Sequence, residues 1–306
     1  MTIHAAPVQG HTDAAWRHFH AAVYGQLADY STPFIRLEKG EARKRDLNDA
    51  FSSLNDNHIL IPQVIFKNET ELTTLVAILK NGGAGAININ MGCPFPLQTA
   101  RGRGAATICR PDAAEAVRKV VEENPDIDFS VKLRLGMTER DEWKSLISVL
   151  NLLKLDHIIL HPRVARQQYG GETDLDAFSE FLSESVNPVI YNGDINTPED
   201  YRLIAERFPT VKGVMLGRGL LGRPSLGAEI SEGVEWDKSR RLEAMKEFHR
   251  LLFRHYRDTL EGGDHQTLSK IIPFWEYAEQ EIGRKAWKAI KKTSNMAKYN
   301  TALTLI

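Results

Sequence analysis

Cys93 is the residue of this chain whose setting most suggests a chemical role. It lies within NMGCPFP, residues 90–96, where two prolines restrict the backbone on either side of Phe95. A free cysteine is usually a small buried hydrophobic residue, but a thiol held in a rigid loop over a pocket can serve as an acid or a nucleophile. Cys109 precedes a predicted helix start at Pro111 and has no comparable setting. We therefore take Cys93 as the candidate reacting group.

Two cations and a histidine lie at the ends of predicted strands. Lys132 and Arg134 are two residues apart in an apolar run, so their side chains point to the same side of a strand. Burying a cation inside a barrel costs free energy unless an anion or a polar ligand binds it. The alternative is that both side chains protrude into solvent. His161 ends the next predicted strand, where a histidine more often has a structural role. A position at the carboxyl end of a barrel strand, where active sites lie, favours a functional role instead.

Two glycine-containing turns could hold a phosphate group. The first is YNGDI at residues 191–195, and the second is LGRG at residues 216–219. Glycines let backbone N–H groups approach a phosphate closely, and Arg218 adds positive charge. Each turn alone is weak support, because a glycine between a strand and a helix is often only a turn residue.

The sequence also predicts a scaffold that brings these strand ends together. Short apolar runs alternate with helical patterns up to about residue 217, which is typical of βα units around a parallel sheet. Strands are expected near residues 3–8, 33–37, 60–66, 85–90, 129–135, 156–161, 187–192 and 212–217. Helices are expected near residues 12–27, 69–81, 111–123, 139–154 and 197–207, with start signals at Thr12, Asn68, Pro111, Thr138 and Thr197. Eight such strands predict a closed α/β barrel of the (β/α)8 TIM type, with its ligands at the carboxyl ends of the strands.

Beyond Pro224 the alternation stops, and helices are expected near residues 239–260, 265–282 and 284–298. We therefore predict two domains, a catalytic barrel over residues 1–236 and an all-helical domain over residues 237–306. Residues 238–306 hold 14 Lys and Arg against 8 Asp and Glu, whereas the rest of the chain holds 25 against 32. A basic tail on an acidic body favours a polyanionic partner.

Composition sets further limits on the class of protein. The 306 residues are 42% hydrophobic and 26% charged, and no apolar run approaches the roughly 18 residues of a membrane span. The first residues lack the pattern of a secretory signal, and two cysteines are too few for a disulfide framework. We expect a cytoplasmic protein without membrane association, most simply a monomer, and no metal site.

The cysteine segment resembles the signature of the tRNA-dihydrouridine synthase family. Residues 87–105, ININMGCPFPLQTARGRGA, satisfy every specified position of that signature. Further similarity follows in order along the barrel, in residues 6–13 (APVQGHTD), Gln63, residues 131–134 (VKLR), 161–163 (HPR), 192–194 (NGD) and 217–219 (GRG). The resemblance covers the barrel and, more loosely, the helical tail.

The resemblance implies FMN as cofactor and NADPH as reductant. It implies that Pro7, Val8 and Gln9 back the flavin and that Gln63, Lys132 and His161 contact its ring or ribityl chain. The phosphate would be held by Asn192, Gly193, Asp194, Gly217 and Arg218. A cation such as Lys132 beside the flavin would stabilise its anionic reduced form.

The resemblance also implies reduction of a uridine in tRNA, with a hydride delivered to C6 and a proton to C5. Cys93 would be the acid, because a thiol with a pKa near 8.5 is mostly protonated at neutral pH. Asn90 would orient the flipped-out base. Other RNA contacts are expected from Arg101, Arg103, Arg134 and Arg166, and from an exposed helix face carrying Lys285, Lys288 and Lys292. The alternative for that face is an ordinary solvated surface.

Two rival functions stay open on the sequence alone. One is an FMN-dependent barrel that acts on a free pyrimidine, such as a dihydropyrimidine or dihydroorotate dehydrogenase; it leaves the basic tail without a purpose. The other is a catalytically silent RNA-binding barrel, against which the combination of Cys93, Lys132 and His161 argues.

Overall fold

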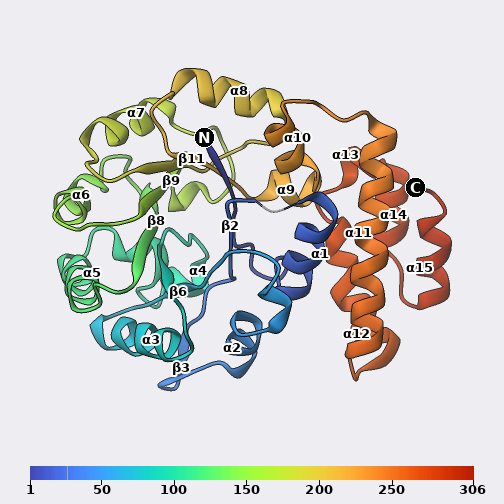
Figure 1. Ribbon diagram of the computed structural model, residues 1–306, viewed down its shortest axis with the longest axis horizontal. Coiled ribbons are helices and arrows are strands. Elements are labelled where there is room, and N and C mark those ends of the chain that lie inside the picture. Colours follow the sequence, from blue (N-terminus) through green and yellow to red (C-terminus); the bar gives the residue numbers. More distant parts are fainter. Residues whose placement is uncertain (26) are drawn as a thin grey trace.

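The computed structural model, which describes residues 1–25 and 27–306, contains a parallel sheet that closes on itself (Figure 1). The strands lie in the order β5-β2-β1-β11-β10-β9-β8-β7-β6. Their bounds are Thr2–Ala5 (β1), Asp29–Ser31 (β2), Leu60–Ile61 (β5), Gln63–Ile65 (β6), Ala86–Met91 (β7), Asp128–Gly136 (β8), His157–Val164 (β9), Val189–Tyr191 (β10) and Gly213–Leu216 (β11). The predicted (β/α)8 barrel is confirmed.

Pro62 explains why the third barrel strand is divided in two. Proline has no N–H to donate to a neighbouring strand, so the regular strand is interrupted at this residue, although Gln63 and Ile65 beyond it still bond to Ile35 on the β2 side. β5 pairs with β2, and β6 pairs with β7. The carbonyl oxygen of Pro62 still accepts the N–H of Asn88 at 2.9 Å. The two halves therefore join the ends of the sheet.

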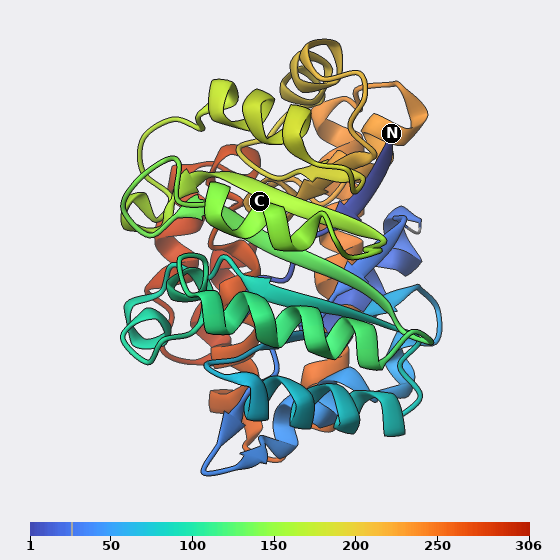
Figure 2. The same ribbon diagram turned by 90° about the vertical axis from the view of Figure 1, so that its left-hand side faces the viewer.

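Helices surround the barrel and are joined to the strands by short turns. They are α1 (Ala14–Tyr24), α2 (Lys44–Ala50), α3 (Glu69–Asn81), α5 (Pro111–Glu123), α6 (Lys144–Leu150), α7 (Leu175–Glu184) and α8 (Pro198–Arg207), followed by α9 (Arg218–Gly222) and α10 (Leu226–Glu232). Figure 2 shows α3, α5 and their neighbours side by side over the strands. Side-chain caps fix several starts, as in α3, where Asn68 accepts the N–H of Glu71 at 3.0 Å.

The inside of the barrel differs from the layer between strands and helices. Most buried apolar side chains, including those of the C-terminal helices, form one large cluster, whereas Ala6, Ile159, Ile190 and Met215 form a separate small cluster. Several polar residues of the strands are also buried: Asn88, Asn90, Ser130, Arg134 and His161, the last of which lies two residues from Ile159 and so on the same face of β9. The interior is therefore partly polar, which suits a barrel that binds a polar ligand.

Several predicted elements are wrong in position. The second strand is β2, not residues 33–37, where Ile35 makes an isolated bridge to Val64. In this short polar strand, which pairs with β1 and β5, Asp29 accepts a hydrogen bond from His4 of β1 at 2.6 Å, a partner that no local pattern reveals. Asp13, not Thr12, caps α1, which ends at Tyr24; the expected extension to residue 27 includes Gln26, outside the described residues.

Two errors concern the middle of the chain. The helix expected at 139–154 is only α6, because the carboxylate of Glu142 binds the N–H groups of Met137 and Glu139 and the hydroxyl of Thr138, forming a turn. Helix α7, between the sixth and seventh barrel strands, was not predicted. In the interval 38–58 the chain forms a hairpin of β3 (Leu37–Glu38) and β4 (Glu41–Ala42), followed by α2.

The C-terminal helices pack beside α1 on one side of the barrel (Figure 1). They are α11 (Lys238–Thr259), α12 (Gly263–Ile271), α13 (Glu279–Ile282), α14 (Arg284–Lys291) and α15 (Met296–Leu303). The single helices expected at 265–282 and 284–298 are each broken, the first at Pro273 and the second before Asn295, which caps α15. Trp16 of α1 and Phe248 of α11 belong to one hydrophobic cluster. The division into two domains stays a prediction.

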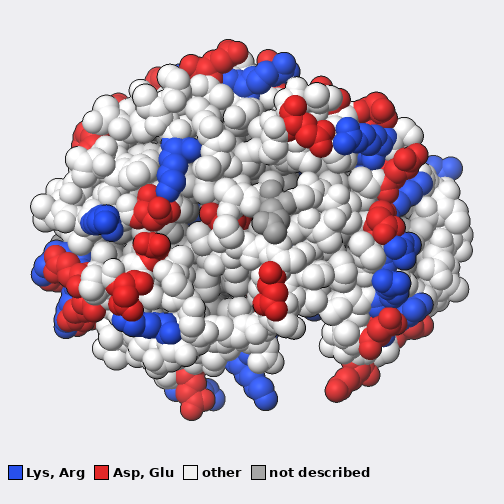
Figure 3. Space-filling view, viewed as in Figure 1, with Lys and Arg blue, Asp and Glu red and all other residues white. Residues whose placement is uncertain are grey.

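Charge on the surface is not uniform. Figure 3 shows Lys and Arg side chains beside Asp and Glu side chains along α11, so that face carries both signs. Lys285 and Lys288 on α14 and Lys292 directly after it are exposed, and no ion pair among the described residues involves them. Within residues 1–25 and 27–306, no helix has the length and apolar character needed to cross a membrane.

Candidate active site

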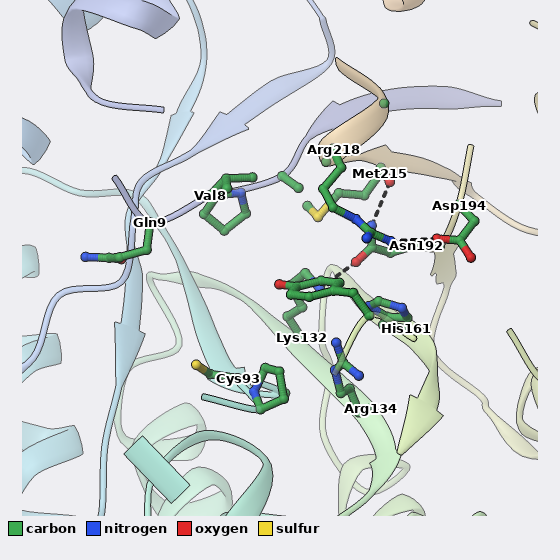
Figure 4. A pocket seen from close by; sticks show the side chains of 18 of the residues that line it. Val8, Gln9, Cys93, Lys132, Arg134, His161, Asn192, Asp194, Met215 and Arg218 are labelled. Carbon is green, nitrogen blue, oxygen red and sulfur yellow. Dashed lines mark hydrogen bonds and ion pairs between the residues drawn. The ribbon is translucent and has the colours of Figure 1, made fainter. Parts of the chain in front are cut away.

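A pocket opens at the carboxyl ends of the barrel strands. It is lined by Ala6, Pro7, Val8, Gln9, Phe34, Gln63, Asn90, Gly92, Cys93, Pro94, Lys132, Arg134, His161, Tyr169, Asn192, Gly193, Asp194, Ile195, Asn196, Met215, Gly217, Arg218, Gly219 and Tyr277. All the residues expected to bind a cofactor lie in this lining, together with Cys93, Asn90 and Arg134. Figure 4 shows Cys93 on one side of the pocket, Arg218 and Asp194 on the other, and Lys132 between them.

Asn90 organises the loop that carries Cys93. Its Oδ1 accepts the backbone N–H groups of Gly92 at 3.0 Å and Cys93 at 2.9 Å. On the other side of the loop, the carbonyl oxygen of Cys93 accepts the N–H of Ala105 at 3.1 Å. Gly104 makes this approach possible, because its φ is +60° and a Cβ there would lie 2.6 Å from that carbonyl oxygen. The backbone of Cys93 is therefore fixed from both sides.

Asn90 is itself the end of a chain of side-chain hydrogen bonds. Its Nδ2 donates to Gln63 Oε1 at 2.8 Å, Gln63 Nε2 donates to Asn88 Oδ1 at 2.7 Å, and Asn88 Nδ2 donates to Ser130 Oγ at 2.8 Å. Because Asn90 Oδ1 is occupied by two N–H donors, each amide in the chain has one possible orientation. Asn88 and Ser130, which do not line the pocket, thus fix how Gln63 faces it.

The environment of Cys93 keeps its thiol protonated. Burial raises the pKa of Cys93, and this effect outweighs the hydrogen bond from the N–H of Phe95 and the nearby cations Arg134 and Lys132, which lower it. A thiol in this state can donate a proton at neutral pH.

Lys132 is a cation with few partners. Its Nζ donates to Asn192 Oδ1 at 2.6 Å, and Asn192 in turn donates to the carbonyl oxygen of Met215 at 2.8 Å. Burial and the neighbouring Arg134 lower the pKa of Lys132 to about 7. An anion bound beside Lys132 would stabilise its charged form.

His161 is neutral and has one defined tautomer. Burial, followed by Arg134 and Lys132, lowers its pKa well below the usual value. Arg163 lies 3.1 Å from Nε2 of His161, and since arginine can only donate, Nε2 must accept and the ring proton must be on Nδ1. Arg163 also pairs with Asp194, which binds Arg218 at 2.9 Å. Two arginines thus share one carboxylate, leaving net positive charge.

The two glycine-containing turns meet at the far side of the pocket. A Cβ at Gly219 would lie 2.0 Å from the carbonyl oxygen of Ile195, so only glycine allows the second turn to pack on the first. Asp194 adopts a left-handed conformation with φ of 42°, which is uncommon for a residue other than glycine. The two turns therefore form one continuous wall.

Six residues expected to contact RNA lie outside the pocket. The expected contact of Arg103 with RNA is wrong, because the residue is only 5% exposed. Its guanidinium makes a two-pronged ion pair with Glu71 at 2.8 and 3.1 Å and so supports the loop from within. Arg101 and Arg166 are exposed beyond the lining, and Lys285, Lys288 and Lys292 lie on the C-terminal helices. Their contacts with RNA stay predictions.

Other pocket residues escaped the sequence reasoning. Tyr277 lines the pocket, and the ring of Tyr169 lies 4.5 Å from the guanidinium of Arg218 and 5.3 Å from that of Arg134. Nothing local marks either tyrosine. Asn88 and Arg163, which support pocket residues without lining the pocket, could have been found, because each lies two residues from Asn90 or His161 and so points to the same side of its strand. Among the described residues, no group of three or more His, Cys, Asp or Glu side chains could hold a metal ion.

Comparison with protein families gives a match over nearly the whole chain. Residues 4–303 match the family described as Dihydrouridine synthase (Dus). A protein of Treponema pallidum (strain Nichols) named "Probable tRNA-dihydrouridine synthase" is 28% identical over 305 residues, covering 92% of this chain and 86% of that one. The tRNA-dihydrouridine synthase B of Escherichia coli (strain K12) is 24% identical over 298 residues, covering 95% and 92%.

Solved structures support the fold. An old yellow enzyme homologue from Zymomonas mobilis superposes with a TM-score of 0.54 at 10% identity, covering 77% of this chain and 90% of that one. Morphinone reductase in complex with tetrahydroNAD gives a TM-score of 0.51 at 8% identity, covering 77% and 88%. At such low identity the likeness concerns the barrel alone.

Proposed function

Because the chain belongs to the dihydrouridine synthase family, we propose that it reduces the C5=C6 bond of a uridine in tRNA to give 5,6-dihydrouridine. The observation that carries the proposal is the convergence of Cys93, Asn90, Lys132 and His161 in one pocket of a chain that matches the family over residues 4–303. The relatives from T. pallidum and E. coli carry names for the same reaction.

The pocket fits an anionic, planar cofactor, and we infer FMN. Arg163 and Arg218 share Asp194, and Lys132 has a single side-chain acceptor, so the pocket has positive charge to offer a phosphate or an anionic ring. Asn192, Gly193, Asp194, Gly217 and Arg218 would hold the phosphate, Pro7, Val8 and Gln9 would back the ring, and Gln63, Lys132 and His161 would contact it. FMN, when bound, supplies the hydride that reduces C6 of the uracil.

The residues of this chain would complete the reduction. Cys93 would donate the proton to C5, since its raised pKa keeps the thiol protonated at neutral pH. Asn90 would act mainly on Cys93, because its Oδ1 already accepts the N–H groups of Gly92 and Cys93. Only the second N–H of its amide would be left to bind the base. Arg134, buried beside Cys93, would offset negative charge that develops on the ring.

We extend the proposal to the electron source, the cellular location and the oligomeric state of the protein. We infer NADPH as electron source, a cytoplasmic location and a monomer acting on tRNA, with Arg101, Arg166 and the lysines of α14 as further RNA contacts. The positive charge of the tail supports the RNA contacts.

The deciding experiment is the dihydrouridine content of tRNA. Flavin-loaded protein is incubated with NADPH and unmodified tRNA, and nuclease fragments are analysed by mass spectrometry. A mass increase of about two units at one defined uridine, from the two hydrogens added, is expected. If NADPH reduces the flavin but no dihydrouridine forms in tRNA, and free uracil or uridine is turned over instead, the result would favour the free-pyrimidine enzyme. Protein that takes up no FMN would contradict both enzymatic functions.

A further inference from the structure

The segment that follows Cys93 carries two large apolar side chains in solvent. Phe95 is 55% exposed and Leu97 is 63% exposed, and they lie at the start of the short helix α4 (Pro96–Thr99). Single exposed apolar residues are ordinary. Here two of them lie in one segment that directly follows the pocket-lining residues Cys93 and Pro94, within four residues of the candidate proton donor. The exposed cation Arg101 follows in the same segment. We call residues 95–101 the α4 segment.

The α4 segment is fixed relative to the thiol. Phe95 lies between Pro94 and Pro96, so the backbone on both sides of it is restricted. Its N–H group binds the Cys93 thiol, and its carbonyl oxygen accepts the N–H of Gln98 at 2.8 Å. The buried Gln98 and the Arg103–Glu71 ion pair hold the base of the segment. An exposed aromatic ring is thus presented at low cost in conformational entropy.

A uridine in folded tRNA is stacked, and it must leave its neighbours to reach Cys93. Unstacking costs a few kcal/mol and exposes the faces of the flanking bases. Once the uridine is in the pocket, its flanking nucleotides must lie over the rim, where the α4 segment adjoins Cys93. Exposed aromatic and apolar side chains that stack on bases or insert between them offset such a cost in other proteins.

We propose that Phe95, supported by Leu97, stacks on a nucleotide that flanks the target uridine and occupies the space that the uridine leaves. Arg101, exposed in the same segment, would contact a phosphate of the same strand. The inference rests on the proposed function, because it requires that the base entering the pocket belong to a polynucleotide.

The test is a double-mutant cycle between protein and RNA. The rate of dihydrouridine formation is measured for wild type and Phe95→Ala with intact tRNA and with tRNA that is abasic at the position 5′ or 3′ of the modified uridine. We expect Phe95→Ala to slow the reaction on intact tRNA roughly tenfold to a hundredfold. On one of the abasic substrates the same substitution should have little further effect, because the stacking partner is already missing. Phe95→Trp should retain the rate on intact tRNA.

Control variants separate stacking by Phe95 from a general loss of surface hydrophobicity or of folding. Leu97→Ala should slow the reaction in the same direction, whereas Leu152→Ala, which truncates a 76% exposed leucine between α6 and β9, should not. Flavin content and circular dichroism show whether each variant is folded. An unchanged rate for Phe95→Ala, or equal effects on intact and both abasic substrates, would overturn the inference. A wild-type protein that forms no dihydrouridine contradicts the proposed function instead.

Discussion

The side-chain oxygen of Asn90 accepts two backbone N–H groups, those of Gly92 and Cys93, and so couples the fourth barrel strand to the thiol. Through Gln63, the same amide is linked to Asn88 and Ser130 inside the barrel. The geometry of the reacting group therefore depends on residues that no substrate touches.

Breaking this chain at Asn88 should disturb Cys93 without removing any pocket residue. We expect Asn88→Ala to lower turnover about tenfold, since Gln63 loses its acceptor and the lost hydrogen bonds are worth about 1 kcal/mol each. Asn88→Asp should restore most activity, because the carboxylate accepts from both Gln63 and the Ser130 hydroxyl. The rate of iodoacetamide alkylation of Cys93, in a Cys109→Ser background, should change in Asn88→Ala only. Equal alkylation rates in all three proteins would contradict the coupling.

Removal of the thiol should abolish the protonation step and leave binding intact. Cys93→Ala is expected to lose a factor of about 10² to 10⁴ in turnover on tRNA, the usual contribution of a general acid. Flavin content and tRNA binding, measured by absorbance and by gel shift, should match wild type. Cys109→Ala is the matched control, because Cys109 is exposed on the surface. Unchanged turnover in Cys93→Ala would remove Cys93 from the mechanism.

Lys132 should make the stability of the flavin-free protein depend on pH. Burial lowers its pKa to about 7 in the folded state, whereas a lysine in an unfolded chain keeps its proton to about pH 10. Between these values the unfolded state binds more protons, so the contribution of Lys132 to the free energy of unfolding becomes more favourable as pH rises, by up to about 1.4 kcal/mol per unit. Urea unfolding at pH 7, 8 and 9 should show this slope in wild type and a smaller one in Lys132→Met. Identical slopes would refute the expectation.

Arg218 should contribute to flavin affinity. It binds Asp194 at 2.9 Å and covers the Tyr169 ring, and we expect its free donors to meet the phosphate. Loss of a charge-assisted hydrogen bond in Arg218→Ala should weaken FMN binding roughly tenfold to a hundredfold. The quenching of FMN fluorescence on titration measures this. Arg207→Ala, which breaks an exposed ion pair between Arg207 at the end of α8 and Asp176 of α7, should leave affinity unchanged. Wild-type affinity in Arg218→Ala would exclude Arg218 from the phosphate site.

The exposed lysines of α14 should contribute to RNA affinity through charge. Reversal of Lys285, Lys288 and Lys292 to Glu should weaken tRNA binding and reduce the slope of log affinity against log salt, because fewer counterions are released. Reversal of Lys39, Lys44 and Lys154 changes the net charge equally at other exposed sites. Filter binding at several salt concentrations compares the two triple variants. If both bind alike, the α14 face is only a solvated surface.

Sequence reasoning succeeded where the signal is local. Alternation along β8 placed Lys132 and Arg134 on one side, and the glycine turns after the last two strands marked a wall of the pocket. It failed where the deciding partner is distant in the chain. Asp29 is buried in a strand because His4 binds it, and Arg103 is internal because Glu71 lies opposite. Tyr277 reaches the pocket only through the packing of the C-terminal helices, which no helical period reports.

The division of the third strand at Pro62 also links folding to function. The ring cannot close until residues 60–65 have met β2 on one edge and β7 on the other. Gln63, which connects Asn88 to Asn90, is the first residue after Pro62. Closure of the barrel therefore also places Gln63 between Asn88 and Asn90. A refolding chain in which residues 60–65 have met only one of these two strands lacks the contact of Gln63 with Asn88 and Asn90 beside the flavin pocket. The recovery of flavin absorbance during refolding would therefore follow the closing of the barrel.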